Sequence, residues 1–222
     1  MIPRYFTELL LEMLEVFPVV AVVAPRQVGK STRVLQPEIP LDQLPPPSNR
    51  RAVLRRHMRD LEEKGWSCAA CTGVCCTFVA NSMRITPVEA RDLRRWLESE
   101  GRWTPELIAS LRDCVTRFRL DQDAGDGRRS LRKTYTCPFY TNSRLGCSIH
   151  PDHKPYGCLA FNARRPGITD GGTCASAQDL LQQREAAFPE ENALNHALAP
   201  DPSPRPIPLA LLTWCPGPET GP

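Results

Sequence analysis

Four cysteines lie within nine consecutive positions of this 222-residue chain, in the stretch "GWSCAACTGVCCTF". They are Cys68, Cys71, Cys75 and Cys76, and the last two are adjacent. Three explanations compete for such a group of thiols: disulfide bonds, a metal held by thiolates, or small apolar side chains in a core. Because each explanation requires a different fold, this cluster constrains the chain more than any other feature.

The N-terminus argues against a disulfide-stapled secreted protein, although ten cysteines would suit one. It has no secretion signal. Its apolar run "FPVVAVVA" is too short to cross a bilayer, and Glu8, Glu12 and Glu15 precede it. We therefore expect a cytoplasmic protein without a membrane partner. In the cytoplasm disulfides are rare, and closely spaced thiols more often bind metal or perform redox chemistry.

The surroundings of the cluster also argue against a buried core or a local disulfide. Gly65, Gly73 and other small residues flank the thiols, where a core segment would show an apolar period. The adjacent Cys75 and Cys76 could bridge each other only through a strained ring. These features favour thiolate metal binding.

Spacing within the cluster sets what each thiol can reach. Cys68 and Cys71 form C-x2-C, a spacing that lets both sulfurs meet one metal. Adjacent residues point to opposite sides of a strand and diverge by about 100° on a helix. We therefore expect one of Cys75 and Cys76 to join the first two, and the other to point to a second site or to a ligand set completed by the later cysteines.

A second group of cysteines follows in "YTCPFYTNSRLGCSIHPDHKPYGCLAF" and shortly after it, separated by turn residues. One all-cysteine tetrahedral site needs four thiolates, so the two groups together allow two metal ions, or one cluster with spare thiols. Thiolates are soft donors that select zinc or iron, the latter also in an iron–sulfur cluster. The candidate ligands are Cys68, Cys71, Cys75, Cys76, Cys137, Cys147, Cys158 and Cys174.

The remaining thiols and nearby imidazoles have other expected roles. His150 follows Cys147 at a spacing known from metal ligands, but with enough thiols present we expect His150 and His153 to be ordinary loop residues. Cys114 lies on the apolar stripe of a predicted helix and should be a small buried hydrophobe. Cys215 lies in a proline-rich ending and is not expected to be a ligand.

Helical patterns dominate the middle of the chain. "RRAVLRRHMRDLEEKG", "TPVEARDLRRWLESEG" and "TPELIASLRDCVTRFRL" each carry an apolar stripe, with Gly65 placed as a C-cap and Thr86 and Thr104 as N-caps followed by proline. Thr86 and Glu89 should form a capping box. The sequence therefore predicts a mainly α fold with irregular cysteine-rich loops, a small domain held together by metal.

Arginines recur among acidic residues at helical spacing, from Arg50 to Arg56 and from Arg91 to Arg95. With a net charge of only +3, we interpret these as solvated helix faces. Neither a nucleic-acid nor a membrane partner is predicted.

The first 36 residues have a different character. A helical pattern and an apolar β-branched run precede "APRQVGKST", which is the phosphate-loop pattern G-x-x-x-x-G-K-[ST] with Ala24 in place of the first glycine. The segment resembles the opening of an AAA-type ATPase. The resemblance makes Gly29, Lys30 and Ser31 candidate nucleotide-binding residues, with Lys30 at the phosphates and Ser31 at Mg²⁺.

A working nucleotide hydrolase also needs a second apolar strand that ends in an aspartate for Mg²⁺. No such strand follows residue 36, and "QPEIPLDQLPPPS" ends the helix that should come after Lys30. ATPase activity is therefore not expected, and nucleotide binding ranks below metal binding.

These patterns divide the chain into four parts. Residues 1–36 form a short, partial P-loop-like α/β segment, and residues 37–49 form a proline-rich linker. Residues 50–188 form the cysteine-cluster domain. Residues 189–222 are expected to be a disordered tail, because many of the 23 prolines gather at its end.

Three motifs together resemble the YkgJ-like cysteine-cluster family, whose members are described as zinc- or iron-chelating proteins. They are "SCAACTGVCC", "RITPVEARDL" and "CPFYTNSRLGCSIHPDHKPYGC", and the resemblance covers about residues 68–174. The chain departs from the family pattern by three residues, "TGV", before the adjacent pair, and by His150 where tyrosine is frequent. By position, the resemblance implies family ligands at Cys68, Cys71, Cys75, Cys76, Cys137, Cys147 and Cys158.

Two classes of function follow. The first is a metal-binding module, structural or mediating protein interactions, without catalysis. The second is an iron–sulfur redox protein or protein-modifying enzyme. The domain shows no carboxylate or Cys–His arrangement typical of a catalytic site, which favours the first class.

Overall fold

The computed structural model divides the chain into two units, residues 1–40 and 41–222. All the residues that the structure describes belong to the second unit. The described ranges are 44–66, 73–122, 133–141, 146–163 and 174–215.

Several predicted site residues lie outside these ranges. The P-loop candidates Gly29, Lys30 and Ser31 are among them, and so are the first two cysteines of the cluster, Cys68 and Cys71. Their roles stay predictions from the sequence.

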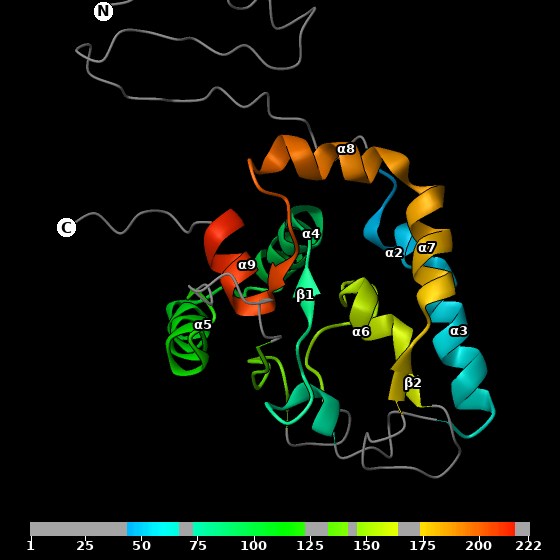
Figure 1. The fold of residues 1–222 in the computed structure, drawn as a ribbon, viewed down its shortest axis with the longest axis horizontal. Coiled ribbons are helices and arrows are strands. Elements are labelled where there is room, and N and C mark those ends of the chain that lie inside the picture. Colours follow the sequence, from blue (N-terminus) through cyan, green and yellow to red (C-terminus); the bar gives the residue numbers. More distant parts are fainter. Residues whose placement is uncertain (1–43, 67–72, 123–132, 142–145, 164–173, 216–222) are drawn as a thin grey trace, which may run out of the picture. The chain divides into compact units, whose positions relative to one another are not determined.

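Helices dominate the described residues, which confirms the mainly α prediction (Figure 1). Within those ranges no helix combines the length and the apolar character needed to cross a membrane. The helices are α2 (Pro47–Arg50), α3 (Ala52–Glu63), η3 (a 3₁₀ turn, Val74–Cys76), α4 (Pro87–Ser99), α5 (Pro105–Phe118), α6 (Tyr156–Ala160), α7 (Gln178–Ala187), α8 (Pro189–Leu198) and α9 (Ile207–Trp214).

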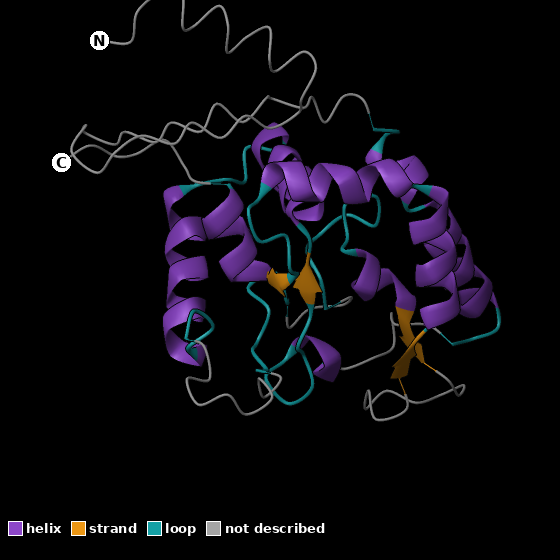
Figure 2. Ribbon diagram, turned by 45° about the horizontal axis from the view of Figure 1, so that its top comes forward, coloured by secondary structure: helices purple, strands orange, loops and turns teal. Residues whose placement is uncertain are grey.

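The described residues contain two short antiparallel ribbons (Figure 2), of which the first joins segments that are distant in the sequence. β1 (Arg84–Ile85) pairs with β4 (Arg205–Pro206), so the chain before α4 lies beside the chain before α9. β2 (Phe161–Ala163) pairs with β3 (Cys174–Ser176) in the register that sets Ala163 opposite Cys174.

The predicted helix boundaries are confirmed where capping residues are present. At the start of α4, the Thr86 hydroxyl accepts the Glu89 N–H at 3.3 Å, and the Glu89 carboxylate accepts the Thr86 N–H at 3.0 Å. The Thr104 hydroxyl accepts the Leu107 N–H at the start of α5. Gly65 follows α3 with φ +79°, a left-handed conformation that favours glycine at this position.

The main core lies between α4, α5 and α9. It includes Leu93 and Leu97 from α4, Leu111 from α5, and Ile207 and Leu211 from α9. A second cluster packs the apolar stripe of α3 against α6 and the start of α7 and contains Leu54, Tyr156, Leu159, Ala160 and Ala177.

The predicted proline-rich linker is partly incorporated in the fold. Leu44 is buried, and Pro47 occupies the first turn of α2, where its missing N–H leaves no helical hydrogen bond unmade. The folded unit therefore begins before residue 50, because this run of prolines includes a helix start.

The expectation of a disordered tail is wrong for residues 189–215. α8 buries Glu191 and Leu194, and α9 buries Leu211 and Trp214. The prolines mark turns and the start of α9 in this segment, and "IPLALLTW" supplies enough apolar surface for a core helix.

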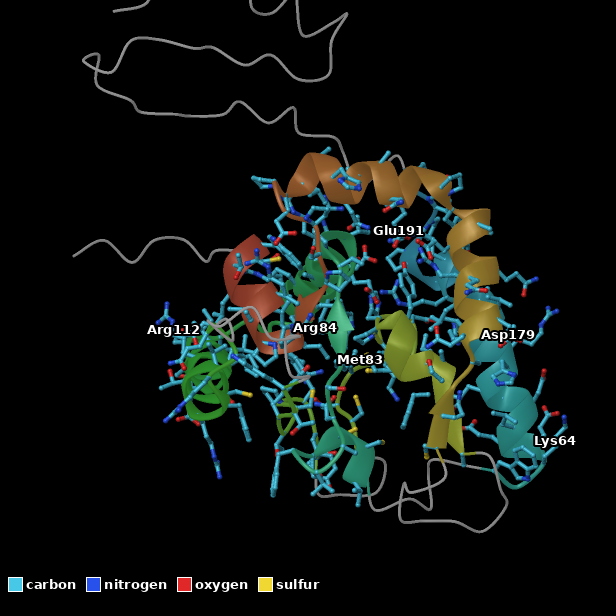
Figure 3. The ribbon with its side chains drawn as sticks, viewed as in Figure 1. Lys64, Met83, Arg84, Arg112, Asp179 and Glu191 are labelled. Carbon is cyan, nitrogen blue, oxygen red and sulfur yellow. The ribbon has the colours of Figure 1, made fainter. Side chains whose placement is uncertain are left out.

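The interpretation of the arginines as solvated is wrong for Arg50 and Arg51, whose exposed fractions are 2% and 0%. Asp92 of α4 accepts two hydrogen bonds from Arg50, at 2.8 and 2.7 Å, and one from Arg51 at 3.2 Å. Glu191 also pairs with Arg50, at 3.0 Å, and lies where α8 meets α2 (Figure 3). The charges are buried because acidic partners from distant helices meet them.

Candidate metal centre

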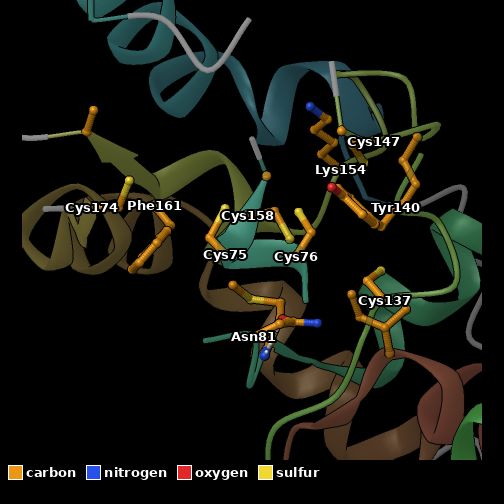
Figure 4. A pocket seen from close by; sticks show the side chains of 16 residues that line it. Cys75, Cys76, Asn81, Cys137, Tyr140, Cys147, Lys154, Cys158, Phe161 and Cys174 are labelled. Carbon is orange, nitrogen blue, oxygen red and sulfur yellow. Dashed lines mark hydrogen bonds between the residues drawn. The ribbon is translucent and has the colours of Figure 1, made fainter. Parts of the chain in front are cut away.

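Six of the eight predicted ligands line one small pocket (Figure 4). Its volume is about 100 Å³. Sites for organic ligands usually enclose about 300 to 1,000 Å³, so this pocket is suited to an ion or a compact cluster. The lining thiols are those of Cys75, Cys76, Cys137, Cys147, Cys158 and Cys174.

A tight turn presents the adjacent pair. Gly73 adopts φ +73°, and the Cys76 N–H donates to the Gly73 carbonyl at 2.8 Å to form η3. The Cys76 carbonyl in turn accepts the Cys137 N–H at 2.8 Å. This backbone bond joins the two cysteine groups that are separate in the sequence.

The loop after Cys137 folds back on itself. The Thr141 N–H donates to the Gly146 carbonyl at 3.2 Å, and the Ser148 N–H donates to the Phe139 carbonyl at 2.9 Å. Cys137 and Cys147 consequently face the same pocket although ten positions separate them.

Two further elements complete the lining. Cys158 lies in α6, where Gly157 allows close approach to Met83, since a Cβ at Gly157 would lie 2.5 Å from the Met83 sulfur. Cys174 begins β3 and is held by its pairing with Ala163 of β2.

The adjacent thiols lie with the later cysteines. Cys75 and Cys76 line the same pocket, and their side chains interact with each other. Rotation about χ1 sets where each sulfur lies, so backbone direction alone does not separate the two thiols. Both thiols therefore lie with the later cysteines, as was expected of one of the two. Whether either thiol also joins Cys68 and Cys71 stays a prediction, because those two cysteines lie outside the described residues.

Burial and hydrogen bonding favour the protonated forms of three lining thiols, those of Cys75, Cys137 and Cys158. Hydrogen bonding with Cys76, together with burial, raises the pKa of Cys75. Burial also raises the pKa of Cys137 to about 12 and that of Cys158 well above the usual value. Since thiolates are the metal ligands, binding a metal here must release protons.

The described cysteines form no disulfides with one another. Within the described ranges, no three Cys, His, Asp or Glu side chains are close enough to hold one metal ion as they stand. Thiols that share an ion must move closer together, and rotation about χ1 is the smallest such movement.

The histidines are loop residues, as predicted. The His150 side chain is 58% exposed, and the ring of His153 stacks on Trp96 with centroids 5.3 Å apart. Neither histidine lines the pocket.

Two described cysteines lie outside the pocket lining. Cys114 is buried on the core face of α5, as predicted, and lies 3.4 Å from the Thr136 carbonyl. Cys215 is also buried, at the end of α9, and burial raises its pKa to about 11. These two thiols provide matched controls for tests of the pocket.

No sequence pattern pointed to the other chemically distinctive lining residues. Met83 precedes β1, and Tyr140 lies in the loop after Cys137. Lys154 precedes α6 and is the one formally charged side chain among the described residues of the lining.

Gly73→Ala should distort the pocket. A Cβ at Gly73 would lie 2.5 Å from Cε2 of Tyr140, which lines the same pocket, and the left-handed φ adds strain. We expect the variant to retain less than about half of the metal bound by the wild type, measured by elemental analysis.

Gly101→Ala is the control, because Gly101 has a similar φ of +62° but open space around it. It should cost about 1 to 2 kcal/mol of backbone strain and leave metal content unchanged. Equal metal content in both variants would show that the turn at Gly73 does not shape the site.

No protein-family model, curated protein or solved structure matches this chain. The resemblance to the YkgJ-like family is thus carried by the sequence motifs alone, and the pocket must be interpreted from its own chemistry.

Proposed function

We propose that this protein binds zinc or iron through its clustered cysteines and serves as a metal-binding module with a structural or protein-interaction role. The observation that supports this proposal best is the convergence of six cysteines from η3, the loops before α6, α6 itself and β3 on one pocket. Such convergence of soft donors suits zinc or iron, and no carboxylate, the donor that Mg²⁺ and Ca²⁺ prefer, is among the described residues of the lining.

The energetics support a structural role. The pocket lies between the two apolar clusters, since Cys137, Cys147 and Cys158 pack against the main core while α6 contributes to the second. Structural zinc in small peptides contributes on the order of 10 kcal/mol, which is comparable to the net stability of a whole domain. A bound metal would therefore link the separate segments that carry these cysteines.

An iron–sulfur redox protein or protein-modifying enzyme is the second candidate. One observation favours it: the pocket offers more thiols than one four-coordinate zinc requires. Cys68 and Cys71 would raise the number further. Two zinc ions that share thiolates would use the surplus as well, so the identity of the metal separates the candidates.

The proposed function also suits a location in the cytoplasm. A reducing compartment such as the cytoplasm would keep these thiols available for metal, and the described cysteines form no disulfides with one another. The YkgJ-like resemblance points to the same chelating chemistry.

Substitution of single cysteines tests the proposal. In protein purified without oxygen, Cys76→Ser and Cys158→Ser should each lose at least about half of the bound zinc or iron, because each removes a ligand at the pocket. Cys114→Ser and Cys215→Ser should retain wild-type metal, since neither thiol lines the pocket.

Elemental analysis of the four variants beside the wild type measures this, and a visible absorption spectrum distinguishes an iron–sulfur cluster from colourless zinc. Wild-type protein without zinc or iron would exclude the proposed function. Equal losses in Cys114→Ser and Cys158→Ser would show that the ligand assignment is wrong.

A further inference from the structure

A divalent metal ion bound by four thiolates would leave an excess of negative charge in the pocket. Four thiolates on a divalent ion leave a net charge of −2, and that charge would lie among largely apolar walls that include Met83, Phe161 and Ile207. An uncompensated charge in such surroundings is unfavourable. A nearby cation is therefore needed for tight binding.

Lys154 lines the pocket and carries a positive charge. Cys147 and Tyr140 line the pocket as well, and no acidic side chain is among the described residues of the lining (Figure 4).

The backbone of Lys154 is fixed on both sides. Its N–H donates to the His150 carbonyl at 3.0 Å, and its carbonyl accepts from the buried Arg51 guanidinium at 2.8 Å. The next residue, Pro155, caps α6, which carries Cys158. The backbone of Lys154, which carries the ammonium group, is therefore held in place. It belongs to the same segment as Cys158.

We infer that Lys154 supplies the counter-charge of the metal site and thereby sets its affinity. The inference rests on the proposed metal-binding function. Lys154 acts here through its charge as a positioning residue, because an ammonium group has no lone pair with which to ligate a metal.

Competition with a chromophoric zinc chelator tests the inference on the full chain. Lys154→Gln should bind zinc about tenfold more weakly than the wild type, the size of effect typical of residues that surround the ligands. Lys154→Arg should bind within about threefold of the wild type, since it keeps the charge. Lys64→Gln, at the exposed end of α3, should have no effect.

Salt provides a readout that loss of packing would not change. The difference between Lys154→Gln and the wild type should shrink when the ionic strength is raised from about 0.05 M to about 0.5 M, because the lysine is partly exposed and its charge is screened.

The outcomes separate the two proposals. A wild type that binds no zinc or iron overturns the proposed function itself. If the wild type binds metal but Lys154→Gln binds equally well, or Lys154→Arg is as weak as Lys154→Gln, then the charge of Lys154 does not set the affinity. A salt-independent difference contradicts the charge role in the same way.

Discussion

Asp92→Asn is expected to lower the free energy of unfolding by about 3 to 5 kcal/mol. Asp92 neutralises Arg50 and Arg51 together, and all three side chains are buried. Removing its charge leaves two guanidinium groups in the interior with Glu191 as the remaining acid bonded to Arg50. Since a domain is stable by about 5 to 15 kcal/mol, this loss brings the protein close to unfolding at room temperature.

The charge state of Arg50 supports this expectation. Burial by itself lowers the pKa of Arg50, but Asp92, Tyr156 and Glu191 outweigh burial and raise that pKa above its usual value. Arg50 thus stays charged in the interior and cannot escape the loss of Asp92 by releasing its proton.

Urea unfolding followed by circular dichroism measures the effect. Glu98→Gln is the matched control, because it removes from the same helix a carboxylate that is 49% exposed, which pairs with Arg94 at 2.7 Å. Exposed pairs of this kind contribute about 0 to 1 kcal/mol. Equal losses in the two variants would show that the buried cluster is no more important than a surface pair.

Asp92→Asn should also weaken the metal site. Arg51 also holds the Lys154 carbonyl, and the Tyr156 N–H at the start of α6 donates to Glu89 of α4 at 2.8 Å. The buried charges therefore connect α4 to the segment that carries Lys154 and Cys158.

Leu211→Ala in α9 should lower the free energy of unfolding by about 2 to 5 kcal/mol. Leu211 is fully buried in the main core, where α9 packs against α4 and α5. Truncation removes apolar contacts and leaves a cavity that the neighbours fill only in part. A folded unit of this size should melt roughly 10 °C lower, as measured by calorimetry.

Thr213→Ala provides the comparison for Leu211→Ala, because Thr213 lies two positions further along α9 with its side chain exposed. Its melting temperature should stay within about 2 °C of the wild type, the range usual for surface substitutions. A Leu211→Ala variant that melts like Thr213→Ala would mean that α9 does not belong to the core.

Local signals in the sequence predicted α3, α4 and α5 well. Thr86 with Pro87 and Glu89, and Thr104 with Pro105, fix helix starts through hydrogen bonds that span only three residues. The apolar stripe that includes Cys114 identifies a buried face for the same reason, since helical periodicity is a local property.

Long-range partners could not be predicted in this way. Arg50 and Arg51 are buried only because Asp92 and Glu191 meet them from other helices, and a charge pattern by itself does not show where such partners lie. The position of Lys154 in the pocket likewise depends on the fold, although it precedes Cys158 by only four residues.

The tail shows how two local signals can conflict. Proline enrichment after residue 200 predicted disorder, while the short run "IPLALLTW" was apolar enough for a core helix. Which signal prevails depends on whether a complementary apolar surface exists, and α4 and α5 provide one.

The identity of the atoms bound to the metal tests the central proposal most directly. X-ray absorption at the zinc and iron edges, recorded on full-length protein purified without oxygen, gives the element and its first ligand shell. The cysteine pocket predicts a shell dominated by sulfur, at about 2.3 Å if the metal is zinc. A shell of nitrogen and oxygen, or no absorption edge from either metal, would contradict it.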